Sequence, residues 1–375
     1  MGLMTTQARA AILRGINEPF EITDVVLDDP RPDEVLVRVE AAGVCGTDLG
    51  VQAGHIPFPL PGVLGHEGAG IVEAVGSAVT SVVPGDHVLL SFTSCGVCRN
   101  CRSGHPAYCT YFLELNLVGG QRLDGSATIS KDGKGVHGHF FAQSSFSNLV
   151  LADERGVTKV DPDADLSLLA PLGCGIQTGA GAVMNVLRPE PGSTLAVFGA
   201  GPVGLSAVMA AALGGSTRIV VMDLVDSRLE LARELGATDV VNSGSTDALQ
   251  ALFELTDGAG VTHALETTGS TRVAATAADA LAPLGKLGLI GAPAPGSTVE
   301  LDVNFMLNGR QVLGITEGDS TPQLFLPALV DLVQQGRFPL QKMITRYAFG
   351  DINTAAADAK SGRVLKPVLH FEDLH

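Results

Sequence analysis

The segment from Cys45 to Glu67 brings together side chains that could hold a metal ion and do chemistry beside it. A thiol, a hydroxyl, a carboxylate, an imidazole and a second carboxylate fall within 23 residues, at Cys45, Thr47, Asp48, His66 and Glu67. A thiolate and an imidazole are ligands that zinc prefers. Two such ligands leave the metal incompletely coordinated, so the segment predicts a zinc site whose third ligand comes from elsewhere in the chain.

Cys174 is the cysteine that remains to supply this third ligand, because the other cysteines form a separate cluster. Three protein ligands with one exchangeable position are typical of a catalytic zinc. The alternative is structural, with Cys45 and Cys174 as small buried apolar residues and His66 as a hydrogen-bonded strand histidine. The motifs that follow favour the catalytic zinc.

The separate cluster places four thiols within fifteen residues, at Cys95, Cys98, Cys101 and Cys109. A tight loop with this spacing can wrap one tetrahedral ion, and four thiolates leave no exchangeable position, so we predict a structural zinc. An iron–sulfur cluster is the alternative, since it also takes four thiolates. Nothing else in the sequence indicates electron transfer, which favours zinc.

A glycine-rich motif follows the apolar run 194–198 and precedes an Ala/Leu/Met stretch of helix length. Gly199, Gly201 and Gly204 form G-x-G-x-x-G. Between a strand and a helix this motif binds the pyrophosphate of a dinucleotide: the first glycine makes the turn, the second lets the backbone approach the phosphates, and the third lets the helix pack on the strand. The helix N-terminus adds amides and the positive end of its dipole.

Asp223 ends the next strand, nineteen residues after Gly204. A carboxylate at this place can accept hydrogen bonds from both ribose hydroxyls of NAD and repels the 2′-phosphate of NADP, so we predict NAD as the cofactor. The alternative is that Asp223 only caps the following helix.

Two kinds of architecture are needed to position these residues. Short strands with glycine-rich turns over residues 8–40, 70–76 and 85–90 predict a compact barrel. From about residue 178 strands alternate with helices, which predicts an α/β fold with a doubly wound parallel sheet. Six strands are expected in it, near 194–198, 218–222, 239–242, 262–267, 286–290 and 312–316. Residues 113–145 read as a long loop, and the tail, with strand texture at 347–349 and 364–369, is expected to rejoin the first domain.

Length and composition limit the classes of function. A chain of 375 residues is too long for one core and predicts two domains. The net charge of −16 disfavours binding to nucleic acid. No apolar run reaches the ~18 residues of a membrane span, and no signal peptide is recognisable at the N-terminus, so we expect a cytoplasmic protein without a membrane partner. Six cysteines then indicate metal ligation in a reducing compartment rather than disulfides.

The chain resembles the zinc-dependent medium-chain alcohol dehydrogenases over essentially its whole length. The resemblance rests on Gly65-His66-Glu67, the four-cysteine cluster, Gly173-Cys174-Gly175 and the dinucleotide motif, which follow the family's order. Residues 140–146 and 173–182 look most like the aryl (benzyl) alcohol dehydrogenase branch. The resemblance implies a GroES-like catalytic domain from residues 1–177 and 317–375, with a structural zinc lobe at about 93–112, and a Rossmann NAD-binding domain at 178–316. It also implies a homo-oligomer, a dimer or tetramer, assembled through the Rossmann domain.

The resemblance also implies roles for individual residues. Cys45, His66 and Cys174 would hold the catalytic zinc, and the cluster a second zinc. Glu67 would be a nearby carboxylate that can reach the metal, Asp48 would fix the tautomer of His66, and Thr47 would pass on the proton of the alcohol. Cofactor contacts are expected from the three motif glycines, Asp223 and four further residues: Val203, Thr178, Arg228 near the adenosine ribose, and Lys366 near the pyrophosphate.

Two positions depart from better-known family members. Gly46 stands where many have a basic residue against the pyrophosphate, and Gly50 where some have a relay histidine. These departures imply looser cofactor binding and leave the exit route of the proton open.

The expected reaction is the reversible NAD-linked oxidation of a primary aromatic or allylic alcohol, of the benzyl, cinnamyl or geraniol type, to its aldehyde. Zinc would act as a Lewis acid on the alcohol, and the nicotinamide would accept a hydride. Phe92, Phe112 and Phe141 are candidate walls of the substrate pocket, or ordinary core residues. The alternatives are a short-chain or glutathione-adduct alcohol dehydrogenase, or a non-catalytic NAD-binding zinc protein, against which the open metal site argues.

Overall fold

The computed structural model describes residues 6–371 and divides them into two compact units. The first unit consists of residues 6–174, 321–336 and 340–371, and the second of residues 175–320 and 337–339. The chain therefore leaves the first unit after residue 174 and returns to it at residue 321, and a short segment, residues 337–339, again belongs to the second unit. The boundaries lie three and four residues from the expected ones, at 174/175 and 320/321.

The first unit contains a five-stranded antiparallel sheet with the order β4-β1-β2-β7-β8. Its hairpin β7–β8 lies inside the segment that was expected to be a long loop. Asp132 and Gly133 connect the two strands, both with positive φ, and an Asp-Gly pair is a strong hairpin signal. The strands are β1 (Thr6–Leu13), β2 (Phe20–Leu27), β4 (Gly62–Val63), β7 (Ile129–Lys131) and β8 (Lys134–Val136).

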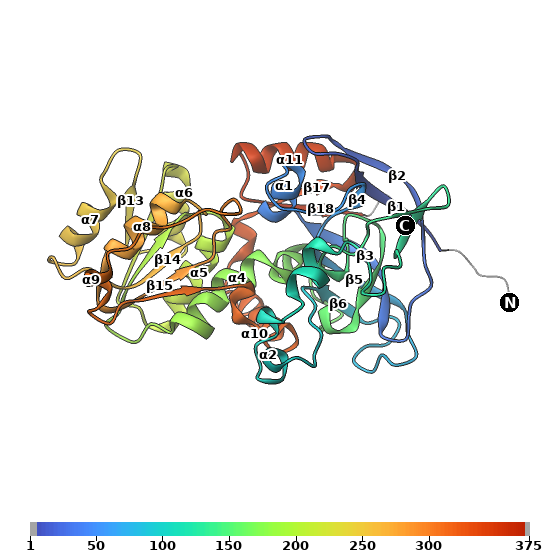
Figure 1. Ribbon diagram of the computed structural model, residues 1–375, viewed down its shortest axis with the longest axis horizontal. Helices are drawn as coiled ribbons and strands as arrows, with labels where there is room; N and C mark the ends of the chain where they lie inside the picture. The colour runs from blue at the N-terminus through green and yellow to red at the C-terminus, as the bar shows by residue number, and fades with distance from the viewer. Residues whose placement is uncertain (1–5, 372–375) are drawn as a thin grey trace. The chain divides into compact units, whose positions relative to one another are not determined.

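A seven-stranded sheet completes the first unit, with the order β10-β6-β5-β3-β18-β17 and β9 paired to β3. The tail strand β18 pairs antiparallel with β3, so a segment from near residue 368 lies beside one from near residue 43 (Figure 1). The expectation that the tail rejoins the first domain is thus met. The strands are β3 (Glu34–Gly43), β5 (Glu67–Val75), β6 (His87–Leu90), β9 (Leu149–Asp153), β10 (Val157–Val160), β17 (Ile344–Ala348) and β18 (Lys366–His370).

Successive side chains of β3 alternate between the two faces of the sheet, and Val35, Val37 and Val39 share the face that lies in the core, where they are fully buried. The first unit also contains five α-helices among the described residues. They are α1 (Gly46–Gln52), α2 (Arg99–Arg102), α3 (Leu166–Leu169), α10 (Pro322–Gln334) and α11 (Ile352–Ser361).

The second unit is built on a six-stranded parallel sheet with the order β13-β12-β11-β14-β15-β16. This order reverses direction at β11 and β14, as in a doubly wound Rossmann sheet, and confirms the predicted fold class. The strands are β11 (Thr194–Phe198), β12 (Arg218–Asp223), β13 (Asp239–Asn242), β14 (Val261–Glu266), β15 (Leu281–Leu289) and β16 (Gln311–Gly314). The helices that accompany the sheet (Figure 1) are α4 (Gly175–Gly181), α5 (Pro202–Gly214), α6 (Asp226–Glu234), α7 (Ala248–Leu255), α8 (Thr271–Asp279) and α9 (Val303–Met306).

In the described part of the chain no single helix is long and apolar enough to cross a membrane. One bent pair, Leu166–Gly173 with Gly175–Leu187, passes such a test on length and composition alone, as buried core helices also do.

Candidate active site

Four potential metal ligands converge within the first unit. The ligand atoms of Cys45, His66, Glu67 and Cys174 all lie within 4.8 Å of one another, and the side chains are buried. Among the described residues, Nε2 of His66 has no hydrogen-bond partner although it is buried. A buried imidazole nitrogen without a partner, facing two thiols, fits a zinc ion. The structure thus brings together the three predicted ligands Cys45, His66 and Cys174.

Asp48 connects two of these ligands. Its carboxylate is fully buried and accepts hydrogen bonds from the backbone N–H of Cys45 at 2.9 Å and of Gly65 at 3.0 Å. The same carboxylate lies 3.1 Å from Nδ1 of His66. Because Nδ1–H donates to Asp48, the lone pair of Nε2 is free for the metal. The first turn of α1 positions Asp48, with Cys45 at the N-cap.

The imidazole of His66 is also held by aromatic rings. Phe141 stacks on it with ring centroids 4.5 Å apart, and Phe140 contacts it edge-on at 5.3 Å. Gly65 has a φ of +88°, and a Cβ there would lie 2.5 Å from the backbone nitrogen of Phe146, so only glycine fits at this turn.

The three candidate pocket phenylalanines form a chain of contacts. Phe112 lies 5.8 Å from Phe92 and 6.4 Å from Phe141, measured between ring centroids. Phe92 and Phe141 are nearly fully buried. They therefore pack as core residues as well, and Phe141 is the one that touches a ligand of the metal.

Glu67 pairs with Lys366 in a buried ion pair. The ammonium donates to both carboxylate oxygens at 2.9 Å, and the lysine is 2% exposed. Burial raises the pKa of Glu67 to about 7, although the Lys366 ammonium acts in the opposite direction. Lys366 was predicted to lie near the pyrophosphate. In the structure its ammonium contacts Glu67 and neutralises a carboxylate that would otherwise be buried without a counter-ion.

Thr47 lies in α1 next to the metal ligands. Its hydroxyl oxygen is 3.9 Å from Sγ of Cys45, and the residue is half-buried. Among the described residues, no heavy atom beyond its chain neighbours and its own helix backbone lies within 4 Å of the Cβ position at Gly46. A Cβ at Gly50 would lie 2.8 Å from Cδ1 of Ile56, so a side chain at this position would collide with Ile56.

The four-cysteine cluster also converges. The thiols of Cys95, Cys98, Cys101 and Cys109 lie within 4.8 Å of one another, and backbone N–H groups point at the sulfurs. The N–H of Cys95 donates to Sγ of Cys109 at 3.3 Å, and the N–H of Cys98 donates to Sγ of Cys95 at the same distance. The backbone amides of Cys101 and Thr110 stabilise the thiolate of Cys98 and lower its pKa to about 5. This fits a closed, four-thiolate metal site.

In the second unit the three motif glycines each meet a different constraint. Gly199 has a φ of +101° at the turn, and a Cβ at Gly204 would lie 1.9 Å from the carbonyl oxygen of Gly199. The Cβ position of Gly201 is open: apart from its chain neighbours, no heavy atom of the described residues lies within 4 Å. The turn, the close packing and the open approach thus match what a pyrophosphate-binding loop needs. Val203 lies in the first turn of α5.

Asp223 ends β12 and bonds to the glycine-rich loop. Its carboxylate accepts from the N–H of Ala200 at 2.7 Å and from the N–H groups of Leu224 and Val225 at 2.8 and 2.9 Å. Helix α6 begins after Val225 without a side-chain cap, so capping by Asp223, the alternative reading, is not observed. Arg228 lies in the first turn of α6, and its buried Nε has no partner among the described residues.

Thr178, expected at the cofactor, is buried in α4. Its hydroxyl donates to the carboxylate of Glu317 at 3.4 Å. Glu317 is itself buried and has left-handed backbone geometry, with a φ of +48°. In this arrangement the side chain of Thr178 is directed to Glu317.

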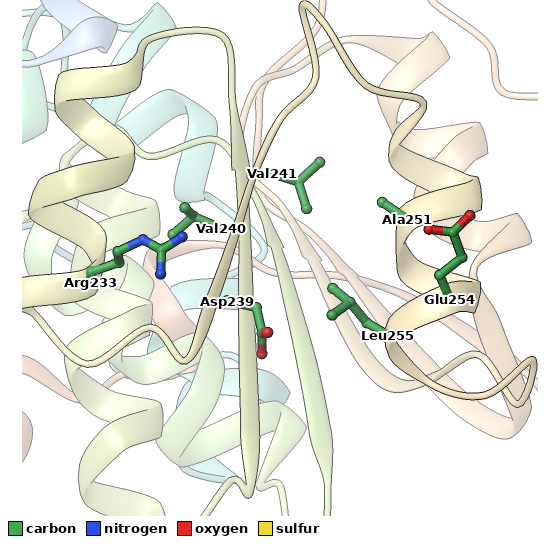
Figure 2. A pocket seen from close by; sticks show the side chains of 7 residues that line it. All are labelled: Arg233, Asp239, Val240, Val241, Ala251, Glu254 and Leu255. Carbon is green, nitrogen blue, oxygen red and sulfur yellow. The ribbon is translucent and has the colours of Figure 1, made fainter.

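A cavity of about 350 Å³ opens beside β13, between α6 and α7 (Figure 2). None of the predicted site residues lines it. Its lining is Arg233, Asp239, Val240, Val241, Ala251, Glu254 and Leu255.

Comparisons with known proteins agree with this geometry. A family model described as alcohol dehydrogenase GroES-like domain matches residues 31–162, and one described as zinc-binding dehydrogenase matches residues 202–335. The chain is 45% identical to a geraniol dehydrogenase of Castellaniella defragrans over 97% of this chain and 98% of that protein. Among solved structures, an alcohol dehydrogenase zinc-binding domain protein from Burkholderia ambifaria is 51% identical, with a TM-score of 0.95 and 98% and 99% of the two chains covered. The benzyl alcohol dehydrogenase of Acinetobacter calcoaceticus is 46% identical, with a TM-score of 0.94 and the same coverage.

Proposed function

The chain belongs to the zinc-dependent alcohol dehydrogenases, which use a nicotinamide cofactor, and we propose that it oxidises primary aromatic or allylic alcohols to aldehydes with NAD. One observation carries the proposal: Cys45, His66 and Cys174 offer a zinc ion three ligands and leave one position for substrate. The choice of alcohol follows from two relatives of nearly half identity, one named for geraniol and one for benzyl alcohol.

Zinc at this centre would act as a Lewis acid that lowers the pKa of the alcohol, and the nicotinamide would take up the hydride. The chain's own residues have three tasks. Asp48 holds the imidazole of His66 in the tautomer that ligates through Nε2. Thr47 has a hydroxyl that can accept the proton of the alcohol and donate its own onward. Phe141 closes one side of the centre with an apolar ring and keeps water from the imidazole.

NAD rather than NADP is proposed because of Asp223. Asp223 is the last residue of β12, and its carboxylate places negative charge where the 2′-phosphate of NADP would lie, so it would repel NADP. Its three amide contacts hold the carboxylate next to the glycine-rich loop. We also propose one zinc in each of the two clusters, hence two per chain.

A second copy of this chain is the proposed partner, through the second unit. Strand β16 ends the six-stranded sheet, and its outer edge is unpaired among the described residues. Three large apolar side chains near this edge, Leu284, Val303 and Leu307, are each more than 70% exposed. Light scattering measures the molar mass of wild type and of a Leu307→Glu variant. A lower mass for the variant supports an interface at this edge, because the added charge would be buried there; an oligomer of unchanged mass would contradict it. The six free cysteines, which serve as metal ligands, suit a reducing compartment such as the cytoplasm.

A substrate panel tests the function. NAD reduction is measured with benzyl, cinnamyl and geraniol-type alcohols and with ethanol as the short aliphatic comparison, on protein of known zinc content. We expect the highest kcat/KM for alcohols with an unsaturated carbon next to the carbinol. A higher kcat/KM for ethanol, or a chain that binds zinc in the four-cysteine cluster alone, would overturn the proposal.

A further inference from the structure

We propose that Gln143 and Ser91 form a buried polar link that fastens the Cys174 segment to the His66 segment, and so act as positioning residues for the metal centre. Asp48 accounts for the alignment of Cys45 with His66, but none of its hydrogen bonds reaches Cys174. The third ligand needs its own connection to the first two.

Gln143 supplies the first half of this link. Its side-chain amide is 1% exposed and donates to the carbonyl oxygens of His66 at 3.0 Å and of Ser91 at 3.1 Å. Its carbonyl oxygen accepts from the N–H of Gly68 at 3.1 Å. The amide therefore holds the backbone on both sides of Glu67 and ties it to the end of β6.

Ser91 supplies the second half. Its buried hydroxyl donates to the carbonyl oxygen of Gly173 at 2.6 Å, one residue before the ligand Cys174. A Cβ at Gly173 would lie 2.2 Å from the carbonyl oxygen of Leu90, so the ligand segment approaches β6 as closely as a glycine allows. Displacing Ser91 would move Cys174 and, through Gln143, disturb His66.

The backbone around Gln143 is strained in a way that serves this link. Phe141, Ala142 and Ser144 have φ values of 51°, 52° and 51°, a left-handed geometry that costs a non-glycine residue about 1–2 kcal/mol. Bonds to the strand that leads into His66 hold this geometry: the hydroxyl of Ser144 donates to Val63 at 2.6 Å, and the N–H of Ser145 donates to Gly65 at 2.8 Å. Strain that the surroundings enforce next to a site is typical of a functional constraint.

The test measures zinc release from the centre rather than activity. A chromophoric chelator is added to three zinc-loaded proteins: wild type, Gln143→Met and Ser91→Ala. A Cys174→Ser variant identifies which phase of zinc release comes from the metal centre, because this phase is absent from that variant. Each variant has a matched control. Asn116 is a buried amide with three backbone bonds of similar length, none of them to the segments of His66 or Cys174, and is changed to leucine. Thr128 is a buried hydroxyl that donates to Gly138 at 2.7 Å and is changed to valine.

We expect Gln143→Met and Ser91→Ala to release the zinc of the centre roughly 10–100-fold faster, the usual scale for residues that orient metal ligands. Their cobalt-substituted forms should also show a shifted visible spectrum. Asn116→Leu and Thr128→Val should lower the thermal midpoint but leave this phase at the wild-type rate. If release from both linking variants is unchanged, or if the controls accelerate it equally, the residues only stabilise the fold and the inference is wrong.

If Gln143→Met does not fold, Ser91→Ala and Thr128→Val decide by themselves. The inference rests on the proposed zinc centre, and the two fail differently. Wild type without zinc at Cys45, His66 and Cys174 would refute the function, whereas unchanged release would refute only the link.

Discussion

Replacing Lys366 with methionine should destabilise the protein far more than removal of an ordinary lysine. The variant leaves the carboxylate of Glu67 fully buried without the ammonium that donates to both of its oxygens. Breaking a buried ion pair from one side typically costs about 3–5 kcal/mol. For a unit of this size each kcal/mol shifts the thermal midpoint by about 2–4 °C, so the expected loss is roughly 6–20 °C.

Two comparisons make this measurement decisive. Lys159 forms a 2.6 Å ion pair with Asp86 but is about half exposed, and Lys159→Met should cost only about 0–1 kcal/mol. The double variant Lys366→Met with Glu67→Gln removes both charges and should recover most of the loss. Thermal midpoints of the four zinc-loaded proteins are compared by calorimetry. Equal losses for the two lysine variants, or a double variant as unstable as Lys366→Met, would refute the reasoning.

Four further outcomes are expected. Asp223→Gly should erode the preference for NAD, measured as the ratio of kcat/KM with NAD and NADP; a wild type without preference would contradict the role of Asp223. Cys98→Ser should lose about one zinc per chain and lower the thermal midpoint, and lost activity with an unchanged midpoint would argue against a structural site. Thr47→Ala should lower kcat roughly a hundredfold or more, while Thr47→Ser stays near wild type; full kcat in Thr47→Ala at unchanged zinc content would remove it from proton transfer. Burial lowers the pKa of His139 to about 4, so the folded protein favours the neutral imidazole. The free energy of unfolding should therefore fall as the pH drops from 6.5 to 4, by about 3 kcal/mol at most. His139→Leu should lose that part of the acid sensitivity in thermal scans at pH 7 and pH 5, and an identical pH dependence would contradict it.

Repetitive features of the sequence predicted the second unit well. The apolar run 194–198 forms β11 with the same limits, because a central parallel strand is buried on both faces and its sequence is a nearly continuous apolar segment. The glycine spacing likewise predicted a loop whose three glycines differ in their surroundings as required.

Long-range contacts in the first unit were beyond the sequence. A lysine near the end of the chain gives no local sign that it will lie against Glu67, some 299 positions earlier. Gln143 lies in the segment 140–146, which resembles the aryl alcohol dehydrogenase branch, but its role depends on left-handed backbone geometry at non-glycine residues, which no sequence propensity favours. Helix α11 was not predicted, although Ile352, Ala355, Ala356 and Ala359 recur at the spacing of one helical face.

The return of the chain to the first unit has a consequence for its synthesis. Both sets of metal ligands lie within the first 174 residues, so they are synthesised before any of the second unit. The cation that balances Glu67 is carried by β18, which also fills an interior place in the seven-stranded sheet between β3 and β17. A nascent chain can therefore acquire metal early, yet its centre keeps an unbalanced charge and an incomplete sheet until the final strand inserts. A chain that ends before residue 366 contains every metal ligand, but it lacks both the cation that pairs with Glu67 and an interior strand of the seven-stranded sheet.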